Sequence, residues 1–146
     1  EASYLSFYGD DAKAREEASA DTKWMESLAT EIVLEDWRLV HAGYDQNLEV
    51  EEQDEGMHMN ARKQFYTSKR PIDPKRTILF GHTPTLKHLH EDDSKAGEVW
   101  FSDVRLKDGR PMAIGMDTCL YHDLEFPRVL SAFNLQTGEV VYQNRV

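Results

Sequence analysis

The sequence predicts an α+β domain in which helices and a strand pair come first and antiparallel hairpins follow. Three observations lead to this prediction. Charged, alanine-containing segments with helical spacing alternate with short apolar runs in the first half of the chain. In the second half, apolar runs flank glycine-containing turns, which is the pattern of β-hairpins. Two strand-length runs, 37–40 and 77–80, each end beside a histidine and a glycine.

Two helical segments are expected near the start of the chain. An aspartate pair at 10–11 can cap a helix that runs to residue 17, and the Asp-Thr dipeptide at 21–22 is a second capping signal. The turn or two after that second cap places three apolar side chains on one face, and this face is expected to lie in the core. The three residues are Trp24, Met25 and Leu28.

The middle of the chain should add a hairpin, a helix and a buried strand. Residues 30–34 and 37–40 read as two strands around a Glu-Asp turn. An acidic loop over 44–56 follows, then a helix over 57–66 that two prolines separate from the strand at 77–80. The middle of the chain therefore contributes both strands and a helix to the α+β prediction.

The back half reads as an antiparallel meander at the end of the domain. Segments 98–106 and 110–116 bracket a Lys-Asp-Gly turn whose glycine suits positive φ. Segments 128–135 and 139–143 bracket a Gln-Thr-Gly turn in the same way. There is no internal repeat and no low-complexity linker, so 1–146 is expected to form a single domain.

Composition excludes several classes of function. The 146 residues carry a formal charge of −10, from 27 acidic against 17 basic residues, which argues against nucleic acid or an anionic membrane as a partner. No stretch approaches the roughly 20 apolar residues of a membrane span, and none resembles a signal peptide. With Cys119 as the one cysteine, an internal disulfide is impossible and a reducing, cytoplasmic location is expected.

The two strand-end histidines, His41 and His82, are the residues that carry the chemical signal. A neutral imidazole is a good ligand for Mn, Fe, Zn, Co or Ni, and a strand end holds it rigidly. Two imidazoles fall short of the roughly four to six donors that a divalent ion takes. From the residues alone, a hydrogen-bonded histidine pair and a single-metal site completed by Asp45 or Asp117 both remain open.

A larger set of motifs resembles a known enzyme family. Val40-His41-Ala42-Gly43, Gly81-His82-Thr83-Pro84 and Ile114-Gly115-Met116-Asp117-Thr118 occur in order, and 130–140 looks like a final hairpin. This set resembles the carboxyl-terminal half of a bacterial calcineurin-like metallophosphoesterase. The similarity is to the serine/threonine protein phosphatases and the enzymes that split dinucleoside tetraphosphates. It implies half of a β-sandwich flanked by helices, over nearly the whole chain.

The resemblance implies a role for three residues. The histidines of the Val-His-Ala-Gly and Gly-His-Thr motifs bind one metal of a dinuclear centre in that family, which implies that His41 and His82 are metal ligands. The arginine on the intervening helix reaches the substrate phosphate, which implies that role for Arg62. Two divalent ions are implied for the complete enzyme: Mn first, with Fe, Zn, Ni or Co as alternatives.

The same resemblance implies that part of the centre is absent. The family's Gly-Asp-x-His-Gly, Gly-Asp-x-x-Asp-Arg-Gly and Gly-Asn-His-Glu motifs do not occur, and Gly9-Asp10-Asp11 continues differently. The chain begins about where the segment after Gly-Asn-His-Glu would begin, so we expect half an enzyme without its general acid. Cys119 also stands where the family usually has glycine.

Two classes of function are therefore expected. The first is a metal-dependent phosphoesterase half, inactive alone, whose complete form acts on phosphoproteins or (di)nucleotides. The second is a non-catalytic binding or assembly module derived from the same fold. A half should expose an apolar face and form homo-oligomers through an open sheet edge, whereas a module should be a monomer with covered edges.

Other polar residues are weaker candidates. Cys119 is expected to be a buried, unreactive thiol because no base accompanies it in sequence. His122 and Asp123 could line the rim of the site. His88 and His90 would share one face of a strand, but no third ligand is evident, so metal binding is not expected there.

Overall fold

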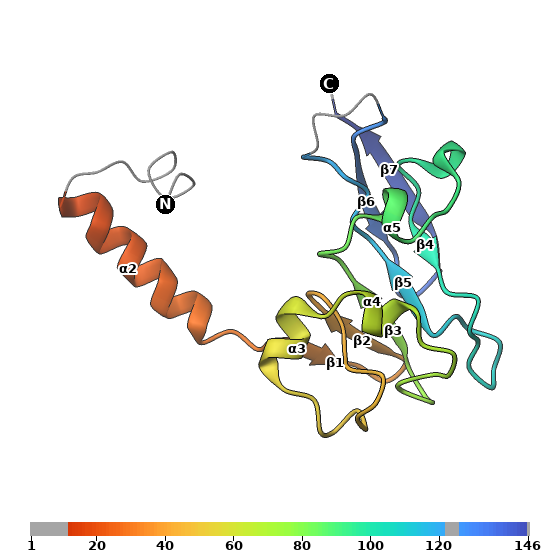
Figure 1. The fold of residues 1–146 in the computed structure, drawn as a ribbon. Coiled ribbons are helices and arrows are strands. Elements are labelled where there is room, and N and C mark those ends of the chain that lie inside the picture. Colours follow the sequence, from red (N-terminus) through yellow and green to blue (C-terminus); the bar gives the residue numbers. More distant parts are fainter. Residues whose placement is uncertain (1–11, 122–125, 146) are drawn as a thin grey trace.

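The computed structural model describes residues 12–121 and 126–145 (Figure 1). The helices are α2 (Ala12–Glu26), α3 (Glu55–Asn60), α4 (Lys63–Tyr66), α5 (Thr85–His88) and the short 3-10 turn η1 (Asp93–Lys95). The strands are β1 (Glu31–Val33), β2 (Trp37–Val40), β3 (Thr77–Phe80), β4 (Trp100–Phe101), β5 (Ala113–Gly115), β6 (Val129–Phe133) and β7 (Val140–Asn144). This mixture of helices and strands is consistent with the α+β prediction.

A five-stranded mixed sheet, in the order β1-β2-β3-β5-β4, forms the body of the molecule. The β1–β2 hairpin is antiparallel, as expected, with Ile32 opposite Leu39. The three central strands are parallel, with Val40 opposite Phe80 and Phe80 opposite Gly115. Parallel neighbours end at the same edge of a sheet, and this brings the segments after β2, β3 and β5 together.

The expected meander at the end of the chain is only partly present. β4 and β5 do pair antiparallel, and β6 and β7 form a separate antiparallel hairpin. However, β5 also pairs in parallel with β3, so it belongs to the mixed sheet. The second hairpin packs against the first sheet where Trp37 meets Phe133, with their ring centroids 5.4 Å apart.

The main core lies between the sheet and α3–α4. Phe65 on α4 meets Phe80 on β3 edge-to-face, with ring centroids 4.9 Å apart, and Tyr44 packs on Phe65. Gly43 is required at this contact, because a Cβ there would lie 2.3 Å from Phe65 Cδ1 at a φ of +148°. The core therefore fixes the backbone immediately after His41.

A polar network is buried on the same side of the sheet. Arg38 donates through Nε to Asp73 Oδ2 at 2.7 Å and through Nη1 to Glu31 Oε2 at 2.8 Å. The Tyr44 hydroxyl donates to Glu31 Oε2 at 2.6 Å. Because both carboxylates are paired, the buried guanidinium has its charge satisfied while it ties β1 and β2 to the loop before β3.

The helix expected over 57–66 is broken into two. Asp54 caps α3 by accepting from Met57 N at 2.8 Å, so this helix begins two residues earlier than expected. Ala61 and Arg62 leave helical geometry between α3 and α4. The break matters because Arg62 then stands at the start of α4, outside a regular helix.

The first helix differs most from expectation. Asp21 and Thr22 lie inside α2 as helical residues, and the Thr22 hydroxyl donates back to Ala18 O at 2.8 Å instead of capping a new helix. In Figure 1, α2 stands away from the sheet. The core assignment of Trp24, Met25 and Leu28 is wrong, because these side chains are 62%, 54% and 49% exposed.

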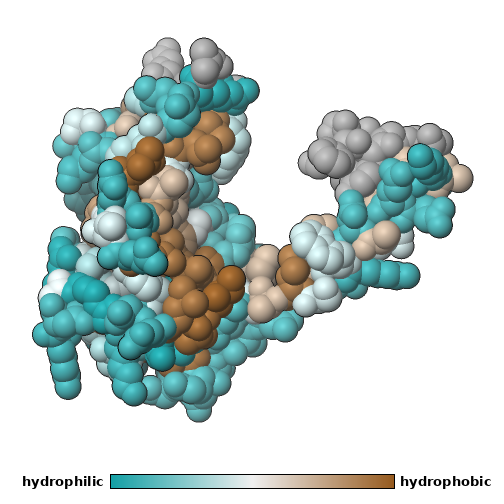
Figure 2. Space-filling model, turned by 180° about the vertical axis from the view of Figure 1, so that it is seen from behind, coloured by the Kyte–Doolittle hydropathy of each residue, from teal (hydrophilic) through white to brown (hydrophobic). Residues whose placement is uncertain are grey.

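The apolar side chains at the end of α2 join an uncovered face of the sheet. Ile32 on β1 is 54% exposed and Met59 on α3 is 43% exposed. Figure 2 shows hydrophobic atoms gathered on the body beside the place where α2 approaches it. Within 12–121 and 126–145, no helix is long and apolar enough to cross a membrane.

Candidate functional site

The two strand-end histidines come together at one edge of the sheet. His41 follows β2 and His82 follows β3 after Gly81, and these strands are parallel neighbours in register. Gly81 N–H donates to His41 O at 2.9 Å, which extends the pairing beyond the strands. His41 Nε2 lies 3.0 Å from His82 Nδ1, with ring centroids 4.8 Å apart and planes at 58°.

This contact has two chemical readings. If one of the facing nitrogens carries a proton, it donates a hydrogen bond to the other. If neither carries one, two lone pairs converge on the same small region, which is the arrangement in which a metal ion binds two imidazoles. The geometry thus brings together the two histidines that the sequence singled out.

In the loop after β3, the strained backbone conformation is that of His82 itself. His82 has a φ of +62°, in the left-handed region that residues other than glycine rarely adopt. Gly81 has no positive φ, and a Cβ there would meet His41 O at an ordinary 3.7 Å. The left-handed residue at this strand end is therefore His82 and not Gly81. A strained residue is a common feature of functional sites, where the surrounding structure holds it in place.

Neighbouring elements hold the two loops in place. Ala42 N–H donates to His58 O on α3 at 2.7 Å, and the His58 ring contacts the Thr30 hydroxyl through Nδ1 at 2.9 Å. On the other side, Met116 N–H donates to Phe80 O and Thr85 N–H donates to Asp117 O. The imidazoles therefore sit between α3 and the segment after β5.

The surroundings of His82 favour the neutral form of its imidazole. Burial lowers the pKa of its imidazole, and the charges of Arg62 and His41 lower it further, while Asp117 opposes them. This dependence also means that the Arg62 guanidinium and the Asp117 carboxylate lie within electrostatic range of the His82 imidazole. A neutral imidazole is the form that binds a metal.

Arg62 lies near the histidines with its side chain exposed. No carboxylate of the described residues lies within 4 Å of its guanidinium. An exposed guanidinium with this freedom can form a bidentate contact to a phosphate oxygen pair. The structure therefore brings His41 and His82 into contact and leaves the Arg62 guanidinium within electrostatic range of His82.

The two carboxylates suggested as a third ligand differ in position. Asp45 Oδ1 accepts from Asn47 N and Nδ2 at 2.8 and 2.9 Å, which commits it to its own turn. Asp117 Oδ1 accepts from Cys119 N at 3.2 Å. Within the described part of the chain, no group of three or more histidine, cysteine or acidic side chains could hold a metal ion. The single-metal site is thus not formed there.

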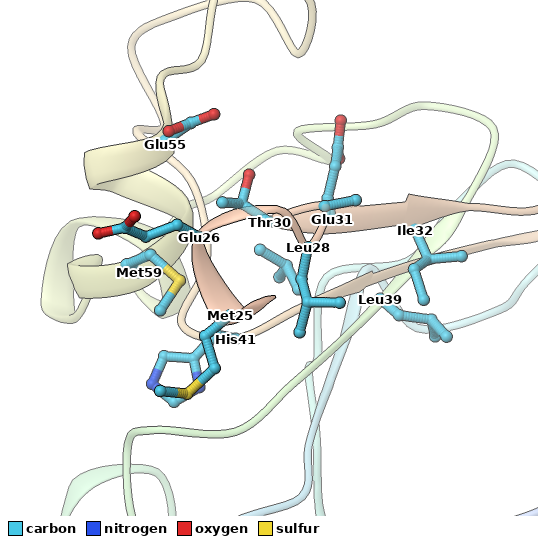
Figure 3. Close-up of a pocket in the computed structure, with 12 residues that line it drawn as sticks. Met25, Glu26, Leu28, Thr30, Glu31, Ile32, Leu39, His41, Glu55 and Met59 are labelled. Carbon is cyan, nitrogen blue, oxygen red and sulfur yellow. The ribbon is translucent and has the colours of Figure 1, made fainter. Parts of the chain in front are cut away.

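An apolar groove of about 590 Å³ begins at His41. It runs between the end of α2, the β1–β2 hairpin and α3, and sequence patterns alone did not indicate its position. Figure 3 draws Met25 and His41 toward one end, Ile32 and Leu39 toward the other, and Met59 on α3 beside them. A polypeptide lying in this groove would reach the histidine pair.

The remaining candidates behave as follows. Cys119 is buried and burial raises the pKa of its thiol, as expected for an unreactive cysteine. His90 Nε2 contacts Glu98 O at 3.2 Å, while His88 is exposed. His122 and Asp123 lie outside the described residues.

No protein-family model, no curated protein and no solved structure matches this chain.

Proposed function

We propose that this chain is the carboxyl-terminal half of a metal-dependent phosphoric ester hydrolase of the serine/threonine protein phosphatase type. In this proposal its sheet is half of a metallophosphoesterase β-sandwich. The observation that carries it is the 3.0 Å approach of His41 Nε2 to His82 Nδ1, with Arg62 within electrostatic reach. The substrate is a phosphoprotein or a (di)nucleotide.

Each of the three residues has a stated task. His41 and His82 donate imidazole nitrogens to one metal ion, Mn first among the candidates, and the remaining donors come from outside the described residues. When bound, the ions would supply Lewis-acid stabilisation of the charge that phosphoryl transfer builds up. Arg62 holds the phosphoryl oxygens through its guanidinium.

The apolar groove supports this half-site interpretation over the alternative. A complete binding or assembly module would cover its sheet, whereas Leu28, Ile32 and Met59 are exposed beside the groove that starts at His41. A polypeptide that covers this face would bury apolar surface and could bring further ligands to the same edge. The non-catalytic module remains the second candidate function.

Metal binding by the isolated chain tests the proposal. Mn²⁺ is added while the histidine ring signals are followed by NMR, because a bound paramagnetic ion broadens nearby resonances. The expected result is selective broadening of His41 and His82, which His82→Ala removes. Equal broadening of the exposed His88 would mean that the pair has no special affinity, and the proposal would fail.

A further inference from the structure

A second groove, of about 630 Å³, lies at the opposite edge of the five-stranded sheet. Four aromatic side chains from three separate segments line it: Tyr66, Trp100, Phe101 and Tyr142. Phe101 and Tyr142 are 42% and 44% exposed, and Trp100 is half-buried. Exposed aromatic side chains that converge in one groove are typical of surfaces that bind a partner.

The groove adjoins an open strand edge. β4 is the outermost strand, and no described strand pairs beyond it. Ser102 N–H donates to Ala113 O, so this opposed pair is hydrogen-bonded across β4–β5. Opposed pairs alternate along an antiparallel ladder, and the N–H and C=O of Phe101 therefore point away from β5. An extended polypeptide can pair with these groups.

Acidic side chains outnumber lysines in the lining of the groove. Four carboxylates line it, from Glu91, Asp92, Glu98 and Asp103, against the two ammonium groups of Lys69 and Lys95. Asp92 Oδ1 already accepts a hydrogen bond from the Ser94 N–H at 2.8 Å. The other three carboxylates form no ion pair within the described part of the chain. The carboxylates of the lining outnumber its ammonium groups by four to two, which favours a cationic ligand.

We propose that this groove binds an extended, basic polypeptide segment. Main-chain groups of the segment pair with the outer edge of β4, its lysine or arginine side chains meet the free carboxylates, and their aliphatic stems lie on Phe101 and Trp100. A dinucleoside polyphosphate is an anion, and four carboxylates repel it.

A short stretch of chain links the groove to the histidine pair. The chain leaves His82, forms α5 and enters the groove at His88. The inference rests on the proposed function in one respect: it makes the substrate a phosphoprotein whose basic segment docks away from the phosphate. The binding step itself needs neither a metal ion nor hydrolysis, and it can be measured separately.

The test uses the chain as it is and a fluorescein-labelled synthetic peptide that alternates arginine with valine. Fluorescence polarisation should give saturable binding that weakens as salt rises, because the contacts are ionic. A matched peptide with glutamate in place of arginine should bind at least tenfold more weakly. NMR should show the largest amide shifts at Phe101 and its neighbours.

Charge reversal identifies the surface. The double variant Glu98→Lys with Asp103→Lys should weaken the arginine peptide about tenfold, as expected for the loss of two exposed ionic contacts. The double variant Glu35→Lys with Glu51→Lys makes the same change in net charge on exposed residues outside the groove and should leave affinity within about twofold. Phe101→Ala should weaken binding without altering the circular dichroism spectrum.

Three results would overturn the inference: equal binding of the acidic peptide, equal weakening by the two double variants, or amide shifts confined to residues outside the groove. Failure of Mn²⁺ to reach His41 and His82 would leave peptide binding intact and would count only against the metal centre. The two proposals therefore fail on different measurements.

Discussion

His41 Nε2 lies 3.0 Å from His82 Nδ1, although 41 residues separate them in the chain. The parallel pairing of β2 with β3 makes this contact, because Val40 is opposite Phe80 and both strands end at the same edge. The φ of +62° at His82 is a backbone conformation that residues other than glycine rarely adopt, so the surrounding loop must hold the residue in it.

This contact predicts the metal affinity of the pair. Zn²⁺ prefers imidazole nitrogen, so the isolated chain should bind it at His41 and His82, and His82→Ala should weaken binding by at least tenfold. Isothermal titration near neutral pH measures the affinity. The exposed His88→Ala variant is the matched control and should bind as the parent chain does.

Catalysis should be absent from the isolated chain. Two imidazoles and one guanidinium supply neither the remaining metal donors nor a general acid, so p-nitrophenyl phosphate should be hydrolysed no faster than in buffer containing Mn²⁺. Release of p-nitrophenol measures the rate. Turnover that disappears in His82→Ala would mean that this chain holds a complete centre.

The backbone after His41 should be intolerant of a side chain at Gly43. In Gly43→Ala the new Cβ would lie 2.3 Å from Phe65 Cδ1, at a φ of +148°. Overpacking and backbone strain together should lower the free energy of unfolding by about 3 kcal/mol. Gly138 has a φ of +75°, but a Cβ there would have no atom within 4 Å. Gly138→Ala should therefore lower the free energy of unfolding by only about 1 kcal/mol. Urea denaturation compares the two.

The ion pairs of Arg38 should make stability depend on pH. Burial alone would raise the pKa of Asp73, but the hydrogen bond from Arg38 holds it below its usual value. Burial likewise opposes the bonds from Tyr44 and Arg38 that lower the pKa of Glu31. A carboxyl with a lowered folded pKa stabilises the fold above its unfolded pKa, so stability should fall as pH drops below about 4.

The variant Asp73→Asn isolates this effect. Removing one partner of a buried ion pair should cost about 3 kcal/mol near pH 7, and the fall in stability toward acid should become shallower. Asp103→Asn changes an exposed carboxylate and should do neither. Urea unfolding at a series of pH values measures both. An unchanged acid dependence in Asp73→Asn would mean that other carboxyls control it.

Local patterns predicted the parts of the fold that short-range geometry determines. The strand ends at His41 and His82 and the two late hairpins, β4–β5 and β6–β7, follow from apolar runs and turn glycines. The pairing of β5 with β3 joins distant segments and leaves no local signature. Helical spacing grouped Trp24, Met25 and Leu28 on one face, but spacing does not say whether anything covers that face.

For the candidate site too, local patterns predicted individual residues but not the surfaces that distant segments form together. A histidine after a short strand indicates where an imidazole stands, and parallel neighbours then bring two such residues together. The apolar groove beside His41 was not predictable in position, because its walls come from α2, β1–β2 and α3. The aromatic groove beside β4 likewise draws Tyr66 and Tyr142 from distant segments.

The uncovered apolar face should make the chain self-associate. Met25, Leu28 and Ile32 are about half exposed around the groove, and β1 is an edge strand of the sheet. Burying such a face against another copy removes apolar surface from water, while the net charge of −10 on each copy opposes close approach. Sedimentation at about 0.15 M salt or above, where charge is screened, should therefore show concentration-dependent oligomers.

Variants on and off the face decide whether it drives this association. Ile32→Glu places a charge in the groove and should shift the equilibrium toward monomer by at least tenfold, because an unpaired carboxylate resists burial. Leu48→Glu makes the same change at an exposed leucine in the loop after β2, outside the groove, and should leave association unchanged. Parent chain that stays monomeric at high concentration would contradict the exposed-half interpretation and favour the self-contained binding module.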